Sequence, residues 1–487
     1  MNSFDVRQRV ARLGWTAALL AVWAWGCSSG GQQAGSDAQL PPDLSMLQSD
    51  GGVDAGARDL ATAVDLALPL AEGKGQWGQD YFADTSVVVV DPKSGAFFIA
   101  GNFSRANFGE GEVTAMGLTD IVLIKYDRTG RREWVRTFGR QYADLMGGLA
   151  VAPDGSVAIT GSTLADSGTA SHDVFVARYS PAGAQLLYTV FASPEIDGGR
   201  GIAVAADGSL YVAGGTRGNI NYGGGPLGKP EKADATLVHL SSSGAHLFSK
   251  RFASAGWGGT TAVAMTQSGD VLISGAAPAD TDFGDKPLVT AGDQVGFLAR
   301  FSATGTLRFA RRLGPCPGTC GSDATGLALA ANGDAVITGF FHGKVNLGDG
   351  EVTSGPDGSN YIARYNTEGV LVQKRILVPT MAGAWPFALA LDRDDQILLG
   401  GQYEGEIDFG GGKTSGASGN ALIAKLTFDS RERWVRRFGS SSSGDAIRSI
   451  AIDTNGNILA VGNNLKKQTV LDAVTLNGPG FLVRLSP

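Results

Sequence analysis

The sequence predicts an all-β fold, a seven-bladed β-propeller with four-stranded blades. Three observations predict it. A unit of about sixty residues recurs seven times, every unit carries turn signals between short apolar runs, and one strand that the last unit lacks stands at the beginning of the repeat region instead. Four short strands per unit, repeated at a regular period, are typical of propellers.

Each unit opens with a β-hairpin. A turn residue is followed six positions later by a glycine, and strings such as Pro153-Asp154-Gly155 hold the Asp-Gly pair that favours tight hairpin turns. The turn residues are Gly95, Gly155, Gly208, Gly269, Gly333, Asp395 and Gly456. The glycines that follow are Gly101, Gly161, Gly214, Gly275, Gly339, Gly401 and Gly462.

The third strand of each unit is a short continuous apolar run, which indicates a strand covered on both faces. The fourth strand carries bulky apolar residues four positions apart, such as Trp134 and Phe138. Six units show this spacing, whereas the chain ends just after the third strand of the seventh. Trp77 and Tyr81 have the same spacing ahead of the first hairpin. We therefore expect residues 74–83 to complete the last blade and close the ring, so that no blade edge stays unpaired.

The sequence motifs of the repeat resemble those of a known family. Phe-Gly-x-Gly, a strand that ends in Ala-Arg-Tyr or a similar string, and Trp-x-x-x-Phe-Gly follow one another, as between Phe108 and Gly139. This pattern is similar to the bacterial β-propeller repeat often labelled SBBP, over roughly residues 74–487. The resemblance implies exported bacterial surface proteins, mostly of undefined activity, and supplies no catalytic residues. The second unit departs from it, because residues 162–172 lack the Phe-Gly element.

Residues 1–26 have the character of a signal peptide, with three arginines ahead of an apolar stretch too short to cross a bilayer comfortably. The stretch ends at Gly26-Cys27-Ser28, which resembles a bacterial lipoprotein cleavage box and implies lipidation of Cys27. Trp25 and Ala24 depart from the usual box. Ser28 resembles the outer-membrane sorting pattern, so we expect an exported protein anchored by lipid to the outer membrane, on its periplasmic or its surface side. An ordinary signal peptide is the alternative.

Residues 27–73 are rich in Gly, Ser, Asp, Ala and Gln, a composition that cannot bury a core. We expect this lipidated low-complexity segment to be a flexible tether, and residues 74–487 to be the propeller. The net charge is −7 and no basic run is present, so nucleic acid is not an expected partner. The expected partner is the membrane, through the lipid anchor, and the ring is expected to be monomeric.

Two further cysteines, Cys316 and Cys320, flank a Pro-Gly turn. In an exported protein such a pair predicts a disulfide, which closes only a short loop. A redox pair and metal ligands are the alternatives, although this spacing is not usual for a zinc site.

Catalytic motifs are scarce. The four histidines, His172, His239, His246 and His342, fall at unrelated positions of their units, and Gly223 to Gly228 matches a dinucleotide-binding pattern without a following helix. Asp453 and Asp392 belong to strings similar to calcium loops, but both strings are hairpin turns of the repeat and lack the downstream glutamate. We therefore expect no catalytic residues, no metal and no cofactor.

A basic or titratable residue ends the third strand of every unit. These residues are Lys125, Arg178, His239, Arg300, Arg364, Lys425 and Arg484. Aspartates stand on the approach to five of the hairpins: Asp84, Asp144, Asp197, Asp323 and Asp445. The cations could form an anion-binding surface. The simpler interpretation is structural: each cation pairs with a carboxylate of its own blade or the next, since cations near a buried strand need partners.

The loops from second to third and from fourth to first strands are the longer ones and share one face of the ring, where binding residues tend to accumulate. Trp257 and Trp385 lie in two of the fourth-to-first loops and could stack a sugar ring or a peptide side chain. Alternatively each fills its own blade junction. The sequence thus favours a non-catalytic scaffold or binding lipoprotein that engages a protein or glycan with this long-loop face. The alternative is a propeller enzyme, a lyase, hydrolase or quinone-dependent dehydrogenase, with a site over the central channel.

Overall fold

The computed structural model describes residues 74–81, 84–109, 111–164, 171–285, 294–314, 321–379, 385–403, 405–414, 420–429, 431–438, 445–463, 469–471, 474–476 and 480–487. All of them belong to one compact unit, which begins at Leu68 and runs to Pro487. These residues form strands and turns, and no helix long and apolar enough to cross a membrane occurs among them.

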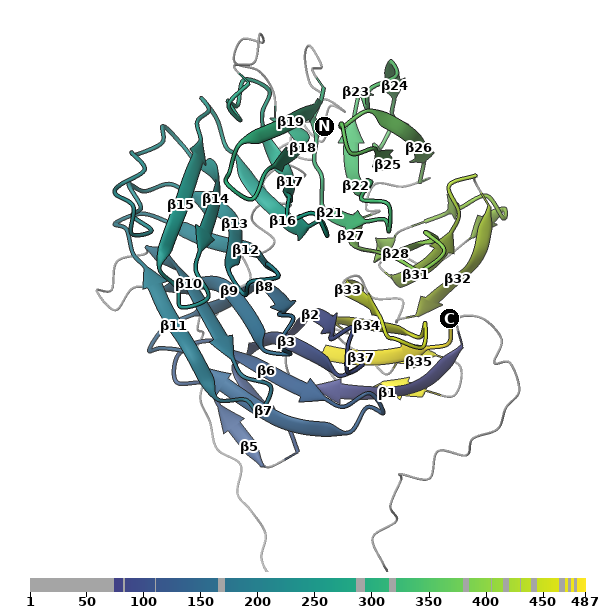
Figure 1. Ribbon diagram of the computed structural model, residues 1–487. Coiled ribbons are helices and arrows are strands. Elements are labelled where there is room, and N and C mark those ends of the chain that lie inside the picture. The colour runs from purple at the N-terminus through teal and green to yellow at the C-terminus, as the bar shows by residue number, and fades with distance from the viewer. Residues whose placement is uncertain are drawn as a thin grey trace, which may run out of the picture. The chain divides into compact units, whose positions relative to one another are not determined.

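The described strands form seven four-stranded antiparallel blades arranged in a ring, which confirms the predicted fold (Figure 1). Blade 1 holds β2 (Asp84–Val90), β3 (Phe97–Phe103), β6 (Asp120–Tyr126) and β7 (Arg132–Phe138). Blade 2 holds β8 (Asp144–Val151), β9 (Val157–Leu164), β10 (His172–Tyr179) and β11 (Gln185–Phe191). Blade 3 holds β12 (Asp197–Val204), β13 (Leu210–Thr216), β14 (Asp234–Leu240) and β15 (His246–Phe252).

Blade 4 holds β16 (Gly259–Met265), β17 (Val271–Pro278), β18 (Gln294–Phe301) and β19 (Leu307–Leu313). In blade 5 the first strand is split into β20 (Gly321–Ser322) and β21 (Gly326–Leu329), followed by β22 (Ala335–His342), β25 (Ser359–Tyr365) and β26 (Leu371–Leu377). Blade 6 holds β27 (Trp385–Leu391), β28 (Ile397–Tyr403), β31 (Asn420–Leu426) and β32 (Glu432–Phe438). Blade 7 holds β33 (Ala446–Ile452), β34 (Ile458–Asn463) and β37 (Gly480–Leu485), with β1 (Gly75–Tyr81) as its outer strand.

The first strand of each blade is the innermost. Each inner strand contacts the inner strands of the blades on both sides, in the cyclic order β2, β8, β12, β16, β21, β27, β33 and back to β2. The apolar cores lie between neighbouring blades: one cluster combines Phe97 and Ile124 of blade 1 with Leu459 and Leu482 of blade 7. The buried strand faces of each blade are thus covered by the next one.

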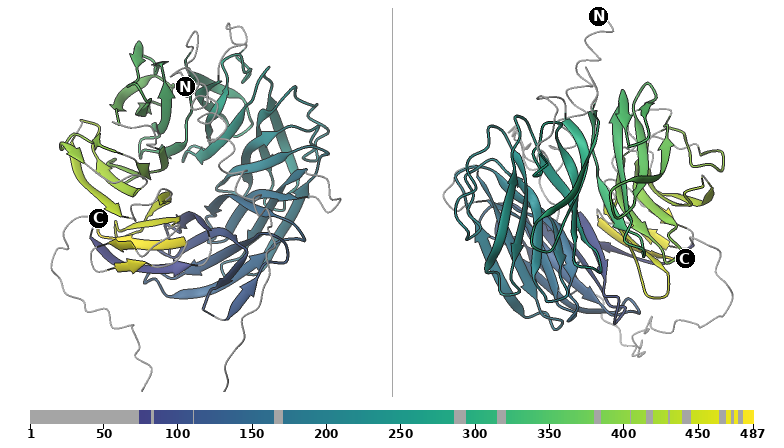
Figure 2. Two further views of the ribbon diagram at one scale, coloured as in Figure 1. Left: turned by 180° about the vertical axis from the view of Figure 1, so that it is seen from behind. Right: turned by 45° about the horizontal axis from the view of Figure 1, so that its top comes forward.

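The ring closes through its two ends, as the sequence predicts. Strand β1 pairs antiparallel with β37, and Trp77 stands opposite Arg484. The two strands, at opposite ends of the colour range, lie side by side in all three ribbon views (Figures 1 and 2). The last blade is therefore assembled from both ends of the repeat region.

The hairpin turns explain the recurring turn residue. All seven turn positions have a positive φ, from 57° at Asp395 to 88° at Gly269. Asp395 is the one non-glycine residue with positive φ in the described part of the chain. Glycine adopts this conformation without strain, and aspartate tolerates it better than most residues do.

The glycine six residues later has a different cause. A β-bulge shifts the register of the inner strand, as between Met146 and Gly148 in blade 2. A Cβ at Gly161 of the neighbouring strand would lie 2.0 Å from the carbonyl oxygen of Leu145. Only glycine lets the two backbones come this close.

Small hairpins in the second-to-third loops explain the Phe-Gly motif. They are β4 (Arg105–Asn107) with β5 (Glu112–Thr114), β23 (Lys344–Asn346) with β24 (Glu351–Thr353), β29 (Ile407–Asp408) with β30 (Lys413–Thr414), and β35 (Thr469–Leu471) with β36 (Val474–Leu476). Phe108 and Phe409 are buried in their blade cores, and the amide of each following glycine donates to the side-chain oxygen of the Asn or Asp just before the phenylalanine.

Candidate functional site

Five of the seven residues at the ends of the third strands have carboxylate partners at the hairpin turns. The closest nitrogen and carboxylate oxygen atoms are 2.9 Å apart for Arg178 and Asp154, 2.9 Å for Arg300 and Asp270, and 3.2 Å for Lys425 and Asp392. Arg364 pairs with Asp334 of its own blade and Asp395 of the next, Arg484 with Asp453, and Lys125 with Glu133. His239 contacts the Ser209 hydroxyl at 2.9 Å instead.

These partners are not the aspartates that precede the hairpins, which the sequence analysis considered as carboxylate partners. Asp144, Asp197 and Asp445 are buried at the opposite end of the inner strands. The basic residues also donate to backbone carbonyls of the next blade, as Lys125 does to Pro181 and Arg300 to Thr367. The column therefore links most blades to the next one at the short-turn end, through its members in blades 1, 2, 4, 5 and 7.

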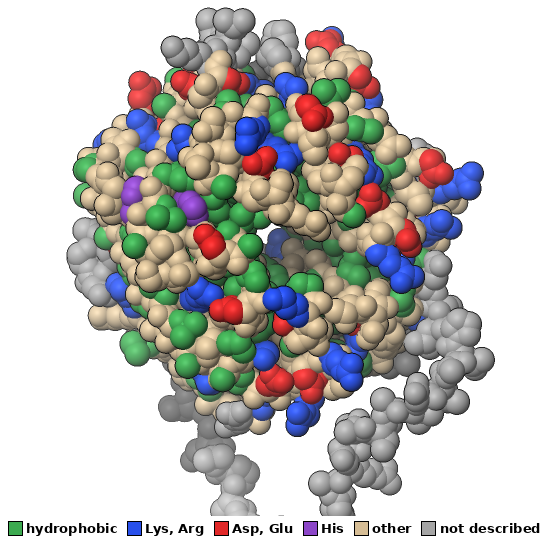
Figure 3. Space-filling view, viewed as in Figure 1, with side chains coloured by type: hydrophobic (Ala, Val, Ile, Leu, Met, Phe, Trp, Pro, Cys, Tyr) green, Lys and Arg blue, Asp and Glu red, His purple; other side chains and the backbone are tan. Residues whose placement is uncertain are grey.

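A central channel runs between the inner strands. Toward the short turns it holds an open cavity of about 500 Å³ whose lining residues have aliphatic side chains, while backbone polar groups form much of its accessible wall. The lining residues are Val88–Val90, Leu149–Val151, Ile202–Val204, Val263, Met265 and Ile450–Ile452. Figure 3 shows one face hollowed at its centre, with hydrophobic side chains and charged side chains of both signs around the hollow.

Each bulge in an inner strand leaves one residue with no residue opposite it in the neighbouring strand, and these residues lie beside the channel. The bulged residues include Arg200 in β12, Thr261 in β16, Phe387 in β27 and Arg448 in β33. Arg448 is exposed although Ile447 before it is buried. Because the free edge of an innermost strand borders the channel, the exposed Arg448 faces its lumen, whereas Arg200 and Phe387 are half-buried. Bulges commonly re-aim a side chain in this way near functional sites.

Trp257 lies on the long-loop face, between blades 3 and 4, with 44% of its surface exposed. The guanidinium carbon of Arg217 is 4.3 Å from the centroid of its ring, a cation–π contact. Beside it, the ammonium of Lys229 lies 2.8 Å from the carboxylate of Glu195. Burial lowers the pKa of Arg217, and the charge of Glu195 works in the opposite direction.

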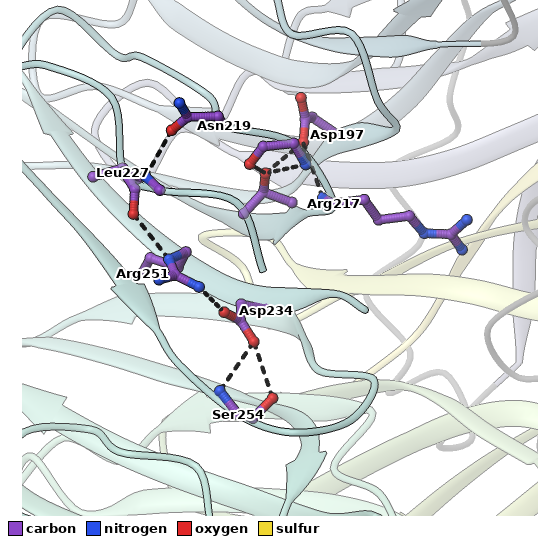
Figure 4. A network of polar contacts seen from close by, with 10 residues as sticks. Asp197, Arg217, Asn219, Leu227, Asp234, Arg251 and Ser254 are labelled. Carbon is purple, nitrogen blue, oxygen red and sulfur yellow. Dashed lines mark hydrogen bonds and ion pairs between the residues drawn. The ribbon is translucent and has the colours of Figure 1, made fainter. Parts of the chain in front are cut away.

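A polar network below the surface holds this site in place (Figure 4). The buried carboxylate of Asp197 accepts hydrogen bonds from the Thr216 hydroxyl and from the Arg217 amide, at 2.5 and 3.2 Å. Asp234 pairs with Arg251 and accepts from the amide and hydroxyl of Ser254, just before Trp257. In Figure 4 the Arg217 side chain points away from this network. The backbone on either side of the Trp257–Arg217 contact is thus fixed, while the guanidinium reaches outward.

Trp385 is packed more tightly. It begins β27 and lies against Phe340 of blade 5, with ring centroids 5.1 Å apart. This contact supports the structural alternative, in which the side chain fills a blade junction. Two positions later, Phe387 lies under the guanidinium of Arg448, whose carbon is 4.6 Å from the ring centroid.

Several carboxylates at the blade junctions titrate abnormally. Burial raises the pKa of Asp144, Asp173, Asp197 and Asp234, and it raises that of Asp323 to about 6. The charge of Asp120 adds to the effect at Asp144, and that of Asp197 at Asp173. These acids accept hydrogen bonds from loop backbone and hydroxyl groups, so their evident role is to hold the long loops.

The histidines are dispersed. His239 stacks on Tyr211 with centroids 4.0 Å apart, His246 contacts the Ser249 hydroxyl, and His342 is exposed. Burial lowers the pKa of His172. Within the described ranges, no group of three or more His, Cys, Asp and Glu side chains is placed to hold a metal ion.

Cys27, Cys316 and Cys320 lie outside the described residues, so their predicted lipidation and disulfide stay predictions. The bulged residues Arg200 and Arg448 were missed by sequence reasoning. A charged residue in the middle of an otherwise apolar first strand, just after a glycine or isoleucine, was the available signal.

Comparison with known proteins supports the repeat assignment. Residues 433–463 match the family model SBBP, described as a beta-propeller repeat. This match spans the fourth strand of blade 6 and the opening hairpin of blade 7, β32 to β34. No curated protein matches the sequence.

Solved structures resemble the chain only at low identity and with TM-scores below 0.5. Hydrazine synthase of Kuenenia stuttgartiensis has a TM-score of 0.46 at 11% identity, over 82% of this chain and 95% of that one. The Pan2 WD40 domain of Neurospora crassa has a TM-score of 0.44 at 8% identity, over 85% and 96%. The Xanthomonas campestris protein XC5397, a gluconolactonase, has a TM-score of 0.35 at 13% identity, over 71% and 87%. Their functions are mixed and carry no argument for this chain.

Proposed function

We propose that this protein is a non-catalytic binding propeller of the bacterial cell envelope, which captures a glycan on its long-loop face. The observation that supports this proposal best is the contact between Trp257 and Arg217. The indole is 44% exposed and has a guanidinium 4.3 Å from its ring centroid. A large exposed aromatic surface on a rigid scaffold is suited to stacking against a sugar ring.

The surroundings supply the polar part of such a site. Glu195 and Lys229 form an ion pair with side chains 44% and 64% exposed, so both can exchange their mutual contact for hydroxyl groups of a ligand. Exposed ion pairs of this kind contribute little to stability, roughly 0 to 1 kcal/mol. The network of Asp197 and Asp234 holds the loop backbone, so binding need not order these loops first.

Anchoring completes the proposal. Lipidation of Cys27 would hold the ring beside the outer membrane, with residues 28–73 as the tether. Replacing Cys27 by Ser should abolish lipid labelling and move the protein from the membrane fraction to a soluble one. Unchanged membrane retention of the variant would refute the anchor.

The binding test uses a glycan array and a pull-down from native envelopes with purified protein. We expect a carbohydrate ligand whose affinity falls at least tenfold in Trp257→Ala, with an unchanged melting temperature. Leu247→Ala is the matched control, because Leu247 is a 52% exposed apolar residue of the outer strand of blade 3. Equal losses in both variants would reject the Trp257 site.

Other outcomes would redirect the proposal. Capture of a defined protein through the same tryptophan would replace the glycan with a protein ligand on the same face. Turnover of a captured glycan, as shorter or unsaturated products, would overturn the non-catalytic interpretation in favour of a hydrolase or lyase over the channel.

A further inference from the structure

Three long loops are in direct contact at the proposed glycan site. The backbone of Trp257, before β16, forms a parallel bridge with that of Ala233, before β14. A Cβ at Gly218, just after β13, would lie 3.3 Å from the Cβ of Glu195, before β12. The loop between β13 and β14 thus contacts both of the others. The side chains that these loops contribute to the site are Glu195, Arg217, Lys229 and Trp257.

These side chains carry two positive charges and one negative charge. The Lys229 ammonium lies 2.8 Å from the Glu195 carboxylate, so these two charges compensate each other. Apart from its contact with Trp257, the Arg217 guanidinium has no hydrogen-bond or ion-pair partner among the residues that the structure describes. Glu195 is the one charge among them that perturbs the pKa of Arg217, and it is already paired. The site therefore offers one guanidinium to an anionic ligand.

This guanidinium lies where a ligand on the tryptophan would meet it. Its carbon is 4.3 Å from the indole centroid, so a sugar on the exposed part of the indole comes within its reach. The Arg217 side chain is half-buried and points away from the polar network below it (Figure 4). Burial lowers the pKa of Arg217, so a carboxylate partner would compensate for the partly lost solvation of its charge. A guanidinium binds a carboxylate through two parallel charge-assisted hydrogen bonds, which are stronger than those to hydroxyl groups.

We propose that the glycan is acidic, and that the site binds a uronic acid residue with its ring against Trp257 and its carboxylate on the Arg217 guanidinium. This inference rests on the proposed function, because it uses the same indole. A neutral sugar stacks on the indole but leaves the guanidinium without a counter-charge. A small inorganic anion pairs with the guanidinium but leaves the indole uncovered. A uronic acid residue matches both groups.

A glycan array of matched pairs tests the proposal. Oligosaccharides of galacturonate, glucuronate and mannuronate are each compared with their carboxyl-reduced forms, which keep the ring stereochemistry and carry a hydroxymethyl group in place of the carboxylate. The purified full-length protein should bind the acidic member of at least one pair about tenfold more tightly than the reduced member, because only the carboxylate forms charge-assisted hydrogen bonds. Added salt should narrow this difference, because salt screens exposed charges.

Variants separate the carboxylate from the sugar ring. Arg217→Gln should reduce the preference for the acidic member about tenfold, because the charge-assisted bonds are lost, while the reduced member binds as before. Trp257→Ala should weaken both members, because both stack on the indole. Arg105→Gln is the control with no expected effect, because Arg105 is an exposed arginine on the small hairpin of blade 1. Melting temperatures within a few degrees of the wild type show that each variant is folded.

Two results would overturn the inference. The first is equal or weaker binding of the acidic member in every pair. If that binding is also lost in Trp257→Ala, the glycan site stands and only its preference for acids is refuted. The second is a preference for the acidic member that persists in Arg217→Gln, which would place the carboxylate elsewhere. Binding that is unchanged in Trp257→Ala, or no binding of any carbohydrate, would refute the proposed function itself.

Discussion

The indole of Trp77 lies against the turn glycine Gly130, so that a Cβ at Gly130 would be 2.7 Å from the indole Cζ2. Trp77 belongs to the outer strand of blade 7 and Gly130 to the last turn of blade 1. The same relationship recurs between other neighbouring blades, with Trp134 against Gly183 and Phe309 against Gly369. The outer strand β1, from the N-terminal end of the repeat region, thus packs an aromatic side chain on a turn glycine of the next blade, as the outer strands of other blades do.

This packing predicts a specific cost at the seam. Gly130→Ala should destabilise the ring by more than Gly269→Ala, because both glycines have positive φ but nothing lies within 4 Å of a Cβ at Gly269. The strain alone costs about 1 to 2 kcal/mol. The extra loss at Gly130 should disappear when Trp77 is also changed to Ala, as a double-mutant cycle in urea measures. Additive losses would show that the two residues do not interact.

Trp77→Ala tests ring closure more directly. The side chain is half-buried and packs on the core shared by blades 7 and 1. We expect a loss of roughly 2 to 4 kcal/mol, somewhat below the range for fully buried tryptophans. Deleting residues 28–73 should leave the melting temperature nearly unchanged, whereas deleting ten residues more should lower it strongly. Equal melting temperatures of the two truncations would contradict closure by β1.

The basic column predicts unequal costs for two ion pairs. Arg364 bridges Asp334 and Asp395 of adjacent blades with its side chain 13% exposed. Arg364→Leu leaves both carboxylates without their cation and should cost about 2 to 4 kcal/mol. The control is Lys344→Ala, which breaks a pair with Glu351 whose side chains are both 52% exposed, and it should cost less than about 1 kcal/mol. Similar losses by chemical denaturation would contradict a linking role of the column.

The cysteines allow a chemical prediction. We expect mass spectrometry under non-reducing conditions to show a bridge between Cys316 and Cys320. Reduction should lower the melting temperature only slightly, because closing so short a loop contributes only about 2 kcal/mol in the chain-entropy estimate. Free thiols in protein isolated from the envelope would refute the bridge.

The repeat made the fold predictable. Turn glycines, third-strand apolar runs and the spacing of Trp77 and Tyr81 are local patterns that can be recognised in the sequence alone. Because each pattern recurs in several units, its assignment is more secure than that of a single occurrence. The bulged arginines were not predictable in this way. A single extra residue shifts the side-chain alternation of an inner strand, and the residue type at the bulge is not the same in every unit. The partners of the basic column show the same limit: Asp154 and Asp334 are turn residues whose proximity to third-strand ends depends on hairpin geometry.

The buried carboxyl group of Asp323 should make the folded protein more stable at low pH than at high pH. Its side chain accepts a hydrogen bond from the Phe340 amide, and burial raises its pKa to about 6 from an ordinary value of 3.8. The folded protein therefore binds the proton more tightly than the unfolded chain. This contribution is fully present below about pH 4 and is lost as the pH rises through about 6. Near neutral pH the folded state retains an ionised, largely desolvated carboxylate.

Asp323→Asn removes that ionisation and keeps an oxygen that can accept from Phe340. We expect the variant to be more stable than the wild type at pH 8, by roughly 1 to 3 kcal/mol at about 1.4 kcal/mol per pKa unit, with the difference vanishing at pH 4. Asp154→Asn is the control of opposite sign, because Ser156 and Arg178 hold the pKa of Asp154 below its usual range. That variant should be less stable than the wild type at neutral pH. Parallel pH profiles of melting temperature for the two variants would show that burial at Asp323 does not govern its titration.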